Sequence, residues 1–240
     1  THPSRGLTPA SLANILQQAE LGYMVAQHDL FVDMEEKDAH IYAEMAKRKR
    51  ALLTVEWGIV PPRNASAQEK KLAGYAKELL QDVPALDEVI LDALDGIGHG
   101  FSCQEIEWGM IGQEWLPKAI THRPQSWFQT DRATRSQIRL RDMSPDGLEL
   151  WPFGWVTHVH KAKSGYLARG GLHRVLAWPY LFKNYSLGDL AEFLEIYGLP
   201  MRVGKYPAGG ANDTEKDTLM KALLSIGHNA AGIIPDSMMI

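Results

Sequence analysis

Four histidines are the residues whose types and spacing could support metal chemistry. His158 and His160 lie two positions apart in the alternating segment 156–160, so a strand would place both on one face. His99 and His122 could lie nearby, and imidazole is a common ligand of zinc. A metal centre needs three or four ligands with outer hydrogen bonds, and no carboxylate or cysteine follows at a matching spacing. We therefore predict no metal site, and keep a metal-dependent hydrolase using His158 and His160 as the enzyme alternative.

Nucleophilic catalysis has no support in the sequence. Cys103 is the single cysteine, without a defined partner histidine and acid, and the chain has no Gly-x-Ser-x-Gly motif. A single cysteine also excludes an internal disulfide framework and fits a reducing cytoplasm. The glycines of segment 96–100 resemble a phosphate-binding loop, but they follow a predicted helix and precede a predicted strand, which reverses the order of that loop. We predict a helix-to-strand turn with positive φ there, and neither an enzyme nor a cofactor.

Composition argues against a protein that coats nucleic acid. The chain has 240 residues, a formal net charge of -4, 45% hydrophobic and 22% charged residues, which is ordinary for a globular protein. A basic face is the usual mark of nucleic-acid coating, although a protein that lets DNA pass without gripping it needs none. The basic run Lys47–Arg50 could contact nucleic acid, but we favour cations near a helix end that pair with acidic residues just upstream. No apolar run reaches the roughly 20 residues of a membrane span.

Periodicity and turn chemistry predict an α+β fold with antiparallel strands. A hydroxyl cap and a proline at Thr8 and Pro9 begin the first helix, and Ser66 with Glu69 forms a capping box for a later one. Helices are expected at 9–22, 36–53 after a segment at 29–34, 66–80, 84–97 and 212–226. Strands are expected at 54–60, 101–110, 114–122, 124–129, 137–141, 156–160, 201–206 and 231–235.

The segment 170–200 is the stretch around which the rest of the chain is organised. Apolar residues recur at mixed three- and four-residue spacings from Leu176 to Tyr197, which predicts a long helix that Pro179 should kink or break. Its polar residues are spread around the helix, unlike those of a surface helix with one apolar stripe. We interpret it as a helix wedged between subunits, with a buried core helix as the alternative. The strand–helix–strand module at 200–235 is too small to bury a core alone.

Long stretches of the sequence resemble the portal proteins of Mu-like phages and prophages. The nearly unbroken run from Trp151 to Pro207 carries most of this resemblance, and it begins WPFGWVTHVH. The other matching stretches are 33–53, 60–66, 92–108, 122–128 and 227–235. Family members continue with a returning helix, more of the first domain and a crown, so we expect this sequence to be a fragment, with 236–240 as the start of a truncated remainder.

The resemblance implies a homo-oligomeric ring, a dodecamer in virions, at one vertex of the capsid. Double-stranded DNA would pass through its channel without specific contacts, driven by the terminase large subunit, and a head–tail connector would dock there later. The other implied partners are capsid and scaffold proteins, and no membrane is involved. Localisation would be the virion, and the host cytoplasm during assembly. In the family's terms, residues 1–169 would be a wing domain, 170–199 the first stem helix and 200–235 the clip.

Two sets of residues follow from this placement. Because a portal needs no catalytic residue and must let DNA slide, only isolated basic residues are candidates for transient phosphate contact. The DNA-channel candidates are Arg174, Lys183, Arg202 and Lys205. The subunit-interface candidates are Tyr180, Phe193 and Tyr197. A monomeric adaptor remains the alternative, and it would need none of these aromatic residues at an interface.

Overall fold

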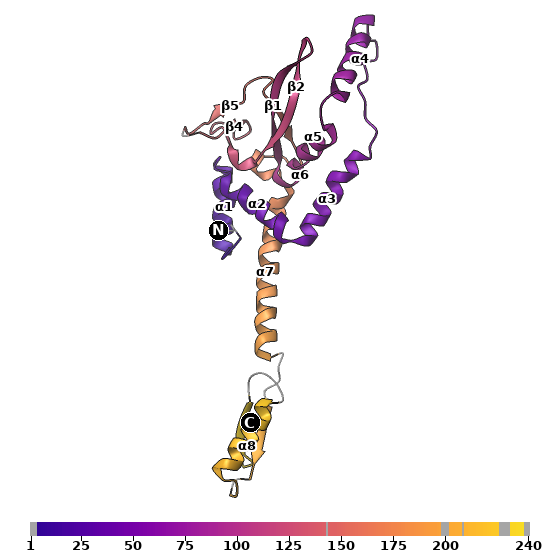
Figure 1. Ribbon diagram of the computed structural model, residues 1–240. Helices are drawn as coiled ribbons and strands as arrows, with labels where there is room; N and C mark the ends of the chain where they lie inside the picture. Colours follow the sequence, from indigo (N-terminus) through magenta and orange to yellow (C-terminus); the bar gives the residue numbers. More distant parts are fainter. Residues whose placement is uncertain (1–3, 143, 198–201, 208, 226–230, 238–240) are drawn as a thin grey trace. The chain divides into compact units, whose positions relative to one another are not determined.

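The computed structural model describes residues 1–240 except 1–3, 143, 198–201, 208, 226–230 and 238–240 (Figure 1). The chain divides into two compact units, Thr1–Leu181 and Phe182–Ile240, and this boundary falls inside helix α7 (Leu172–Tyr197). Helices combine with small, mainly antiparallel sheets, so the fold is α+β, as predicted.

In the described part of the chain, six α-helices precede the first strand. Thr8 accepts a hydrogen bond from the backbone of Ser11 at the start of the first, and the capping box of Ser66 and Glu69 begins the fourth, both as the sequence indicated. The six helices are α1 (Pro9–Glu20), α2 (Val25–Lys37), α3 (Ala39–Leu53), α4 (Ala67–Gln81), α5 (Leu86–Ala93) and α6 (Gly96–His99).

The predicted helix at 36–53 is wrong at its start, because Asp38 separates α2 from α3. The backbone of Asp38 is extended (φ -103°, ψ 102°), and its carboxylate accepts hydrogen bonds from the N–H groups of His40 and Ile41. An aspartate that satisfies the free amides of a helix start is a strong cap. The segment predicted at 29–34 is part of a longer element, the 13-residue helix α2.

Two three-stranded antiparallel sheets follow among the described residues. The larger has the order β2–β1–β6, and β1 and β2 form the predicted hairpin, with a bulge between Glu107 and Trp108. The strands are β1 (Phe101–Ile111), β2 (Glu114–Arg123) and β6 (Trp155–Val159) in this sheet, and β3 (Phe128–Thr130), β4 (Ile138–Leu140) and β5 (Leu148–Glu149) in the smaller one. Short 3₁₀ helices, η1 (Gln125–Trp127) and η2 (Leu167–Arg169), precede β3 and α7.

The strand predicted at 54–60 does not form. This segment is a turn followed by irregular chain, and Val60 is 85% exposed. Alternation of residue types marks a strand only where a neighbouring strand can pair with it, and no strand of the described chain pairs with this segment. Prolines at 61 and 62 then lead into the cap of α4.

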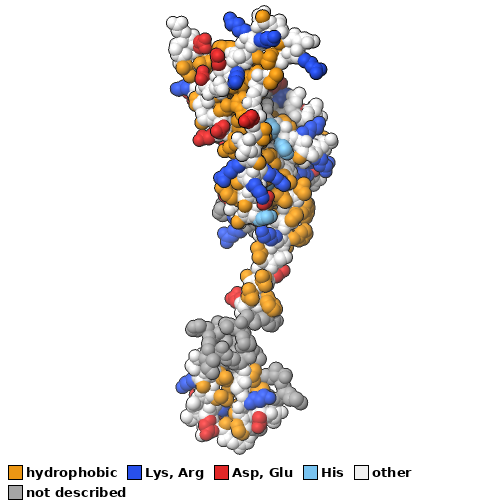
Figure 2. All heavy atoms as spheres, turned by 90° about the vertical axis from the view of Figure 1, so that its right-hand side faces the viewer, with side chains coloured by type: hydrophobic (Ala, Val, Ile, Leu, Met, Phe, Trp, Pro, Cys, Tyr) orange, Lys and Arg blue, Asp and Glu red, His pale blue; other side chains and the backbone are white. Residues whose placement is uncertain are grey.

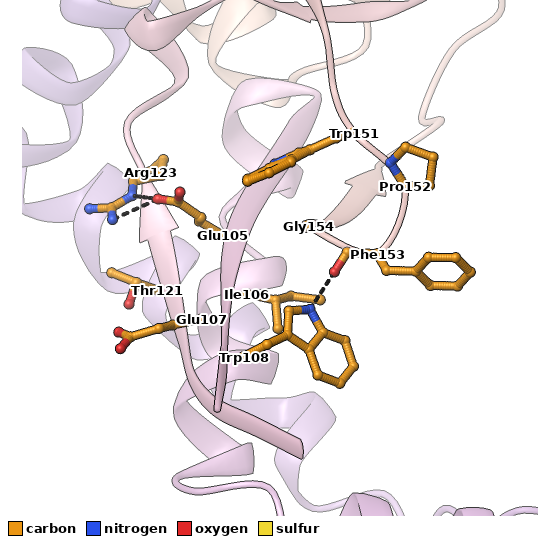
Figure 3. Close-up of a pocket in the computed structure, with 10 residues that line it drawn as sticks. All are labelled: Glu105, Ile106, Glu107, Trp108, Thr121, Arg123, Trp151, Pro152, Phe153 and Gly154. Atoms are coloured by element: carbon orange, nitrogen blue, oxygen red, sulfur yellow. Dashed lines mark hydrogen bonds and ion pairs between the residues drawn. The ribbon is translucent and has the colours of Figure 1, made fainter. Parts of the chain in front are cut away.

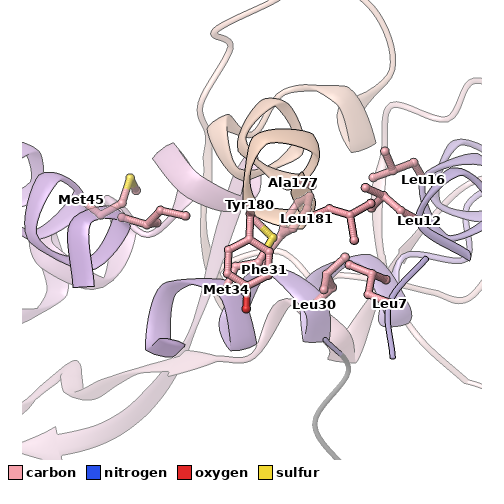
Figure 4. Close-up of a cluster of buried hydrophobic side chains, with 11 residues drawn as sticks. Leu7, Leu12, Leu16, Leu30, Phe31, Met34, Met45, Ala177, Tyr180 and Leu181 are labelled. Atoms are coloured by element: carbon pink, nitrogen blue, oxygen red, sulfur yellow. The ribbon is translucent and has the colours of Figure 1, made fainter. Parts of the chain in front are cut away.

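The first unit is organised around the first ten residues of α7. Ala177, Tyr180 and Leu181 are buried against α1 and α2, as Figure 4 shows for the cluster that also includes Leu12 and Phe31. A second cluster, with Phe101, Cys103 and Phe128, fills the space between the two sheets. Of the kink or break predicted at Pro179, the break does not occur, since α7 continues through Pro179 as one helix.

The second unit contains the rest of α7 and a small module. Its two strands, β7 (Arg202–Tyr206) and β8 (Ala231–Pro235), are parallel, and α8 (Asp213–Ser225) connects them, as the predicted strand–helix–strand order requires. Asn212 caps α8, since its side chain accepts from the N–H of Glu215 while the Glu215 carboxylate accepts from the N–H of Asn212. The predicted ends at 198–200, 226–227 and 238–240 lie outside the described residues. Among those described, no helix is long and apolar enough to span a bilayer.

Candidate assembly surfaces

The part of α7 within the second unit exposes a wide apolar surface. Five of its large apolar side chains are each more than half exposed, and at 100° per residue they fall within an arc of about 140° on the helix, whereas Tyr185 (41% exposed) lies outside this arc. We call this surface the α7 stripe. Its members are Phe182, Leu187, Leu190, Phe193 and Leu194. Figure 2 shows apolar side chains (orange) along this part of the helix. A contiguous exposed apolar surface of this kind marks a site of association.

Of the three predicted interface residues, only one has a described side chain on this surface. Phe193 is 55% exposed and belongs to the α7 stripe. Tyr180 is 4% exposed, because its ring packs into the core of its own chain. The structure therefore does not place Tyr180 on a surface that another subunit could contact. The side chain of Tyr197 lies outside the described residues.

The predicted DNA-channel residues have different environments. Arg174 is held inside the first unit, where its guanidinium donates to the carbonyl of Leu16 (3.2 Å) and to Oε1 of Gln27 (2.7 Å), and pairs with Glu20. Burial lowers the pKa of Arg174, and the negative charge of Glu20 acts in the opposite direction. Arg174 therefore serves the fold, and the prediction that it is available to DNA is wrong.

Two of the other three DNA-channel candidates are exposed. Lys183 lies on α7 and Lys205 on β7, both with exposed side chains. The side chain of Arg202 lies outside the described residues. Of the basic run in α3, Lys47 pairs with Glu44 (3.6 Å) and Lys49 pairs with Glu35 (3.4 Å), which confirms pairing with upstream acids for these two.

The histidines considered for metal binding do not form a ligand set. The rings of His158 and His160 have centroids 6.3 Å apart, and His160 lies just beyond the end of β6. Burial lowers the pKa of His158, and the neighbouring His160 lowers it further by a smaller amount. Within the described part of the chain, no group of three histidine, cysteine or acidic side chains is placed to hold a metal ion. The glycines at 96–100 form α6 and its end, where only Gly100 has a positive φ (95°).

A different histidine cluster, which the sequence did not indicate, joins α2, α6 and α7. Nδ1 of His28 lies 3.0 Å from Nδ1 of His99, and Nε2 of His173 lies 2.9 Å from a carboxylate oxygen of Glu35. All three imidazoles are at most 2% exposed. Their rings also pack edge to face against Phe31 or one another. The cluster therefore fixes the start of α7 on the first unit.

Two charged groups connect this histidine cluster to α3 and η1. Nζ of Lys49 lies 2.8 Å from Asp95 and 3.4 Å from Glu35, and Nε2 of Gln125 donates to Asp95 at 2.6 Å. Burial raises the pKa of Asp95, but nearby positive charge and these hydrogen bonds lower it more, so that the pKa lies well below its usual range. Burial lowers the pKa of His99 to about 4, with Asp95 opposing that shift. At neutral pH the histidine is uncharged while Asp95 and Lys49 are ionised. This arrangement stabilises the fold and borders an open hollow of about 1050 Å³, whose lining includes Glu35, Asp95, His99 and Gln125.

A long helix that exposes an apolar stripe is typical of a protein that associates with other chains. The family model described as the portal protein of Mu bacteriophage matches residues 28–240. The chain belongs to this family of Mu-type phage portal proteins, whose members are structural proteins rather than enzymes.

Two curated relatives align along almost the entire chain. The Mu-like prophage FluMu protein gp29 of Haemophilus influenzae is 55% identical over 239 residues, and the portal protein of Escherichia phage Mu is 52% identical over 237 residues. Each alignment covers 99% of this chain and 46% of the relative. The chain thus spans about half the length of these relatives.

Proposed function

We propose that this chain is part of a portal that forms a ring at one vertex of a phage capsid, through which double-stranded DNA is packaged and ejected. Residues 1–169 act as its wing, 170–199 as its first stem helix and 200–235 as its clip. The ring is a virion component that assembles in the host cytoplasm with capsid and scaffold proteins. It docks the terminase large subunit first and a head–tail connector afterwards.

The α7 stripe is the observation that supports ring formation. Phe182 and Phe193 are 11 residues apart, or about three turns, so the stripe runs along the helix rather than ending at one point. The exposed half of these five apolar side chains is costly, at roughly 25 cal/mol per Å² of apolar surface in contact with water. Packing of the stripe against helices of neighbouring copies removes that cost, and is the role that a stem helix has in a ring.

Sliding of DNA needs a channel with few permanent phosphate contacts, because each contact adds a salt-dependent binding term. A net charge of -4 fits such a channel. Lys183, Arg202 and Lys205 are the proposed transient contacts, and Arg174 is removed from this set by its internal hydrogen bonds. Reversing all three charges should reduce packaging of DNA into proheads. Unchanged packaging by that triple variant would refute these contacts without affecting the ring.

The ring is tested by measuring the mass of the full gene product that carries this sequence, alongside residues 1–240 alone. We expect a ring from the full protein, measured by light scattering. A full protein that remains a monomer with scaffold and capsid proteins present would refute the proposal and favour the monomeric adaptor. Metal-dependent hydrolysis would instead require stoichiometric metal and an activity lost on chelation.

A pair of variants tests the role of the α7 stripe. Phe193→Lys places a charge on the stripe and should raise the concentration needed for ring formation by about tenfold or more. Asn184→Lys adds the same charge on the opposite side of the helix and should leave ring formation nearly unchanged. Equal effects of the two variants would show that the stripe is not an interface.

A further inference from the structure

Arg135, in the loop between β3 and β4, has a backbone conformation that is unusual for its residue type. Its φ of 54° lies in the left-handed region, which residues other than glycine and asparagine rarely adopt. Among the described residues, Ala85 and Phe153 are the only other non-glycine residues with a positive φ. Such strain persists only where the surrounding structure enforces it, and it is concentrated at active sites and ligand-binding sites.

Hydrogen bonds to one buried carboxylate enforce this conformation. Asp131 is 7% exposed, and its carboxylate accepts from the backbone N–H groups of Thr134, Ser136 and Gln137 at 2.6 to 3.1 Å. The N–H of Arg135 donates to the carbonyl of Asp131 at 3.1 Å, and its own carbonyl accepts from the N–H of Leu167 at 3.4 Å. We call residues 131–137 the arginine loop. Since both backbone groups of Arg135 are bound, its side chain starts from a fixed point.

Two guanidinium groups of the arginine loop lie over tyrosine rings. The guanidinium carbon of Arg135 is 5.0 Å from the ring centroid of Tyr166, and that of Arg132 is 5.9 Å from the ring centroid of Tyr23. Arg132 also donates to the hydroxyl of Tyr23 at 2.6 Å. A cation is attracted to the face of an aromatic ring. Both guanidinium groups therefore have a preferred position, although Arg132 is exposed and Arg135 is only half-buried.

Two arginines nearby in the sequence show the more usual arrangement, in which a carboxylate accepts from the guanidinium. Arg123 pairs with Glu105 at 2.7 Å, as the dashed lines of Figure 3 show. Arg139, at the end of the arginine loop, pairs with Glu149 at 2.8 Å. The charges of these two arginines are therefore balanced within the chain.

Within the described chain, no carboxylate pairs with the guanidinium of Arg132 or Arg135. Glu20 pairs with Arg169 and Arg174. Asp146 accepts from the backbone N–H of Arg132 at 3.2 Å, not from its guanidinium. The carboxylate of Asp131 is likewise occupied by backbone N–H groups of the loop. The two positive charges of the arginine loop are thus held in place without an acidic partner from the described residues.

The chemistry of this loop fits a phosphate group. A guanidinium presents five N–H donors in one plane, and two of them form parallel hydrogen bonds with one phosphate. A single carboxylate could bind in the same way. Duplex DNA, however, offers closely spaced phosphates in a row, and two arginines on one rigid loop suit a row better than one isolated anion. Exposed aromatic rings beside arginines are also common on surfaces that bind nucleic acids.

We propose that Arg132 and Arg135 bind phosphate groups of double-stranded DNA. The proposal rests on the proposed portal function, which brings duplex DNA to this protein, and adds a contact on the first unit. The transient contacts proposed above, Lys183, Arg202 and Lys205, all belong to the second unit. A preorganised contact on the first unit therefore does not belong to the residues past which DNA is proposed to slide.

Binding of a short labelled duplex to the full gene product tests the site, with fluorescence anisotropy measured over a series of salt concentrations. Arg132→Gln together with Arg135→Gln should raise Kd by about tenfold or more. The slope of log Kd against log salt should fall by about 2 for each arginine loop that the duplex contacts, since each phosphate contact contributes about 0.9. An unchanged slope would overturn the site.

Two further double variants control for charge and for folding. Arg48→Gln together with Arg50→Gln removes the same charge from two exposed arginines of α3 and should leave the slope nearly unchanged. An equal fall in slope from this pair would show a general effect of net charge and overturn the site. Lysine at positions 132 and 135 keeps both charges and should restore the slope. A slope that lysine does not restore would also count against phosphate contact.

Other anions give different results in the same variants. Calorimetric titration with inorganic phosphate should show no binding that depends on Arg132 and Arg135. If it does, and the duplex slope is unchanged by their substitution, the site takes a free anion and the DNA proposal is overturned. A glutamine double variant that binds DNA normally but no longer assembles with capsid or scaffold proteins would instead indicate a protein carboxylate, which also overturns it.

Light scattering on the same samples separates this site from the portal itself. Rings whose DNA slope falls in the glutamine double variant support both proposals. Rings whose slope does not change overturn the phosphate site and leave the portal proposal standing. A slope that falls in a protein that stays monomeric with scaffold and capsid proteins present would support the phosphate site and refute the portal.

Discussion

Mild acid should destabilise the first unit through its buried histidines. His99 is 2% exposed, and burial lowers its pKa to about 4, with the neighbouring His173 acting in the same direction and Asp95 in the opposite one. In the unfolded chain the pKa returns to about 6.5. Between these two values the unfolded state binds more protons than the folded state, so stability falls as the pH is lowered from 6.5 toward 4.

The size of this effect follows from the shift in pKa. A difference of about 2.5 pKa units, at 1.36 kcal/mol per unit, corresponds to about 3 kcal/mol of stability lost by pH 4. The pKa of His28 is lowered as well, by burial and then by His99, so it contributes a loss of the same sign. Asp95 acts in a separate window. Its pKa is held below the usual value, so the stability that it contributes is lost only as the pH falls below about 4.

Urea unfolding followed by tryptophan fluorescence measures this loss. All seven tryptophans lie between residues 57 and 178, so the signal reports the first unit alone. Unfolding free energies at pH 7.5, 6.5, 5.5 and 4.5 should decrease steadily below pH 6.5. His99→Gln should reduce this slope, whereas His40→Gln, which removes an exposed histidine, should retain it. A free energy that stays constant from pH 6.5 to 4.5 in the parental protein would refute the reasoning.

Three further changes should alter stability in directions that the same unfolding assay can measure. Gly98→Ala would drive a methyl group into the ring of His173, which is fully buried, and should cost about 1–3 kcal/mol; no loss would contradict that close packing. Phe153→Gly should raise the stability of the isolated chain by about 1 kcal/mol by relieving the positive φ, so a loss would contradict the strain. Asp131→Ala should cost about 2 kcal/mol, because the carboxylate accepts from three backbone N–H groups of the following turn. An unchanged free energy of unfolding would contradict the stabilising role of the Asp131 carboxylate.

Features set by neighbouring residues were predictable from the sequence. Thr8 and Ser66 sit at helix starts with their partners three residues later, and the structure has helices beginning at both. The β1–β2 hairpin and the β7–α8–β8 module were also predicted with nearly correct bounds. Such signals are local, so they do not depend on how the rest of the chain folds. The segment 54–60 shows the opposite case, because its alternation needed a neighbouring strand that the described fold does not supply.

Features set by distant segments were not predictable in this way. Periodicity identified the apolar residues of α7, but it did not show that α1 and α2 cover its first ten residues. Tyr180 was therefore predicted at a subunit interface and Arg174 in a DNA channel, although both contact their own chain. His28, His99 and His173 are far apart in the sequence, and nothing in their spacing predicts that they meet. The left-handed backbone of Phe153 had no signal either, since glycine or asparagine usually occupies such a position.

The close approach of α6 to the start of α7 has a consequence for sequence drift in this family. A Cβ on Gly98 would overlap the His173 ring, and a Cβ on Gly171 would overlap the backbone of Gly98 and His99, so any larger residue would push the two helices apart. Gly58 and Gly74 have nothing within 4 Å of such a Cβ. Diverged relatives that retain this contact should therefore keep glycine at positions 98 and 171, while alanine should replace Gly74 freely, since it favours the middle of a helix by about 1 kcal/mol.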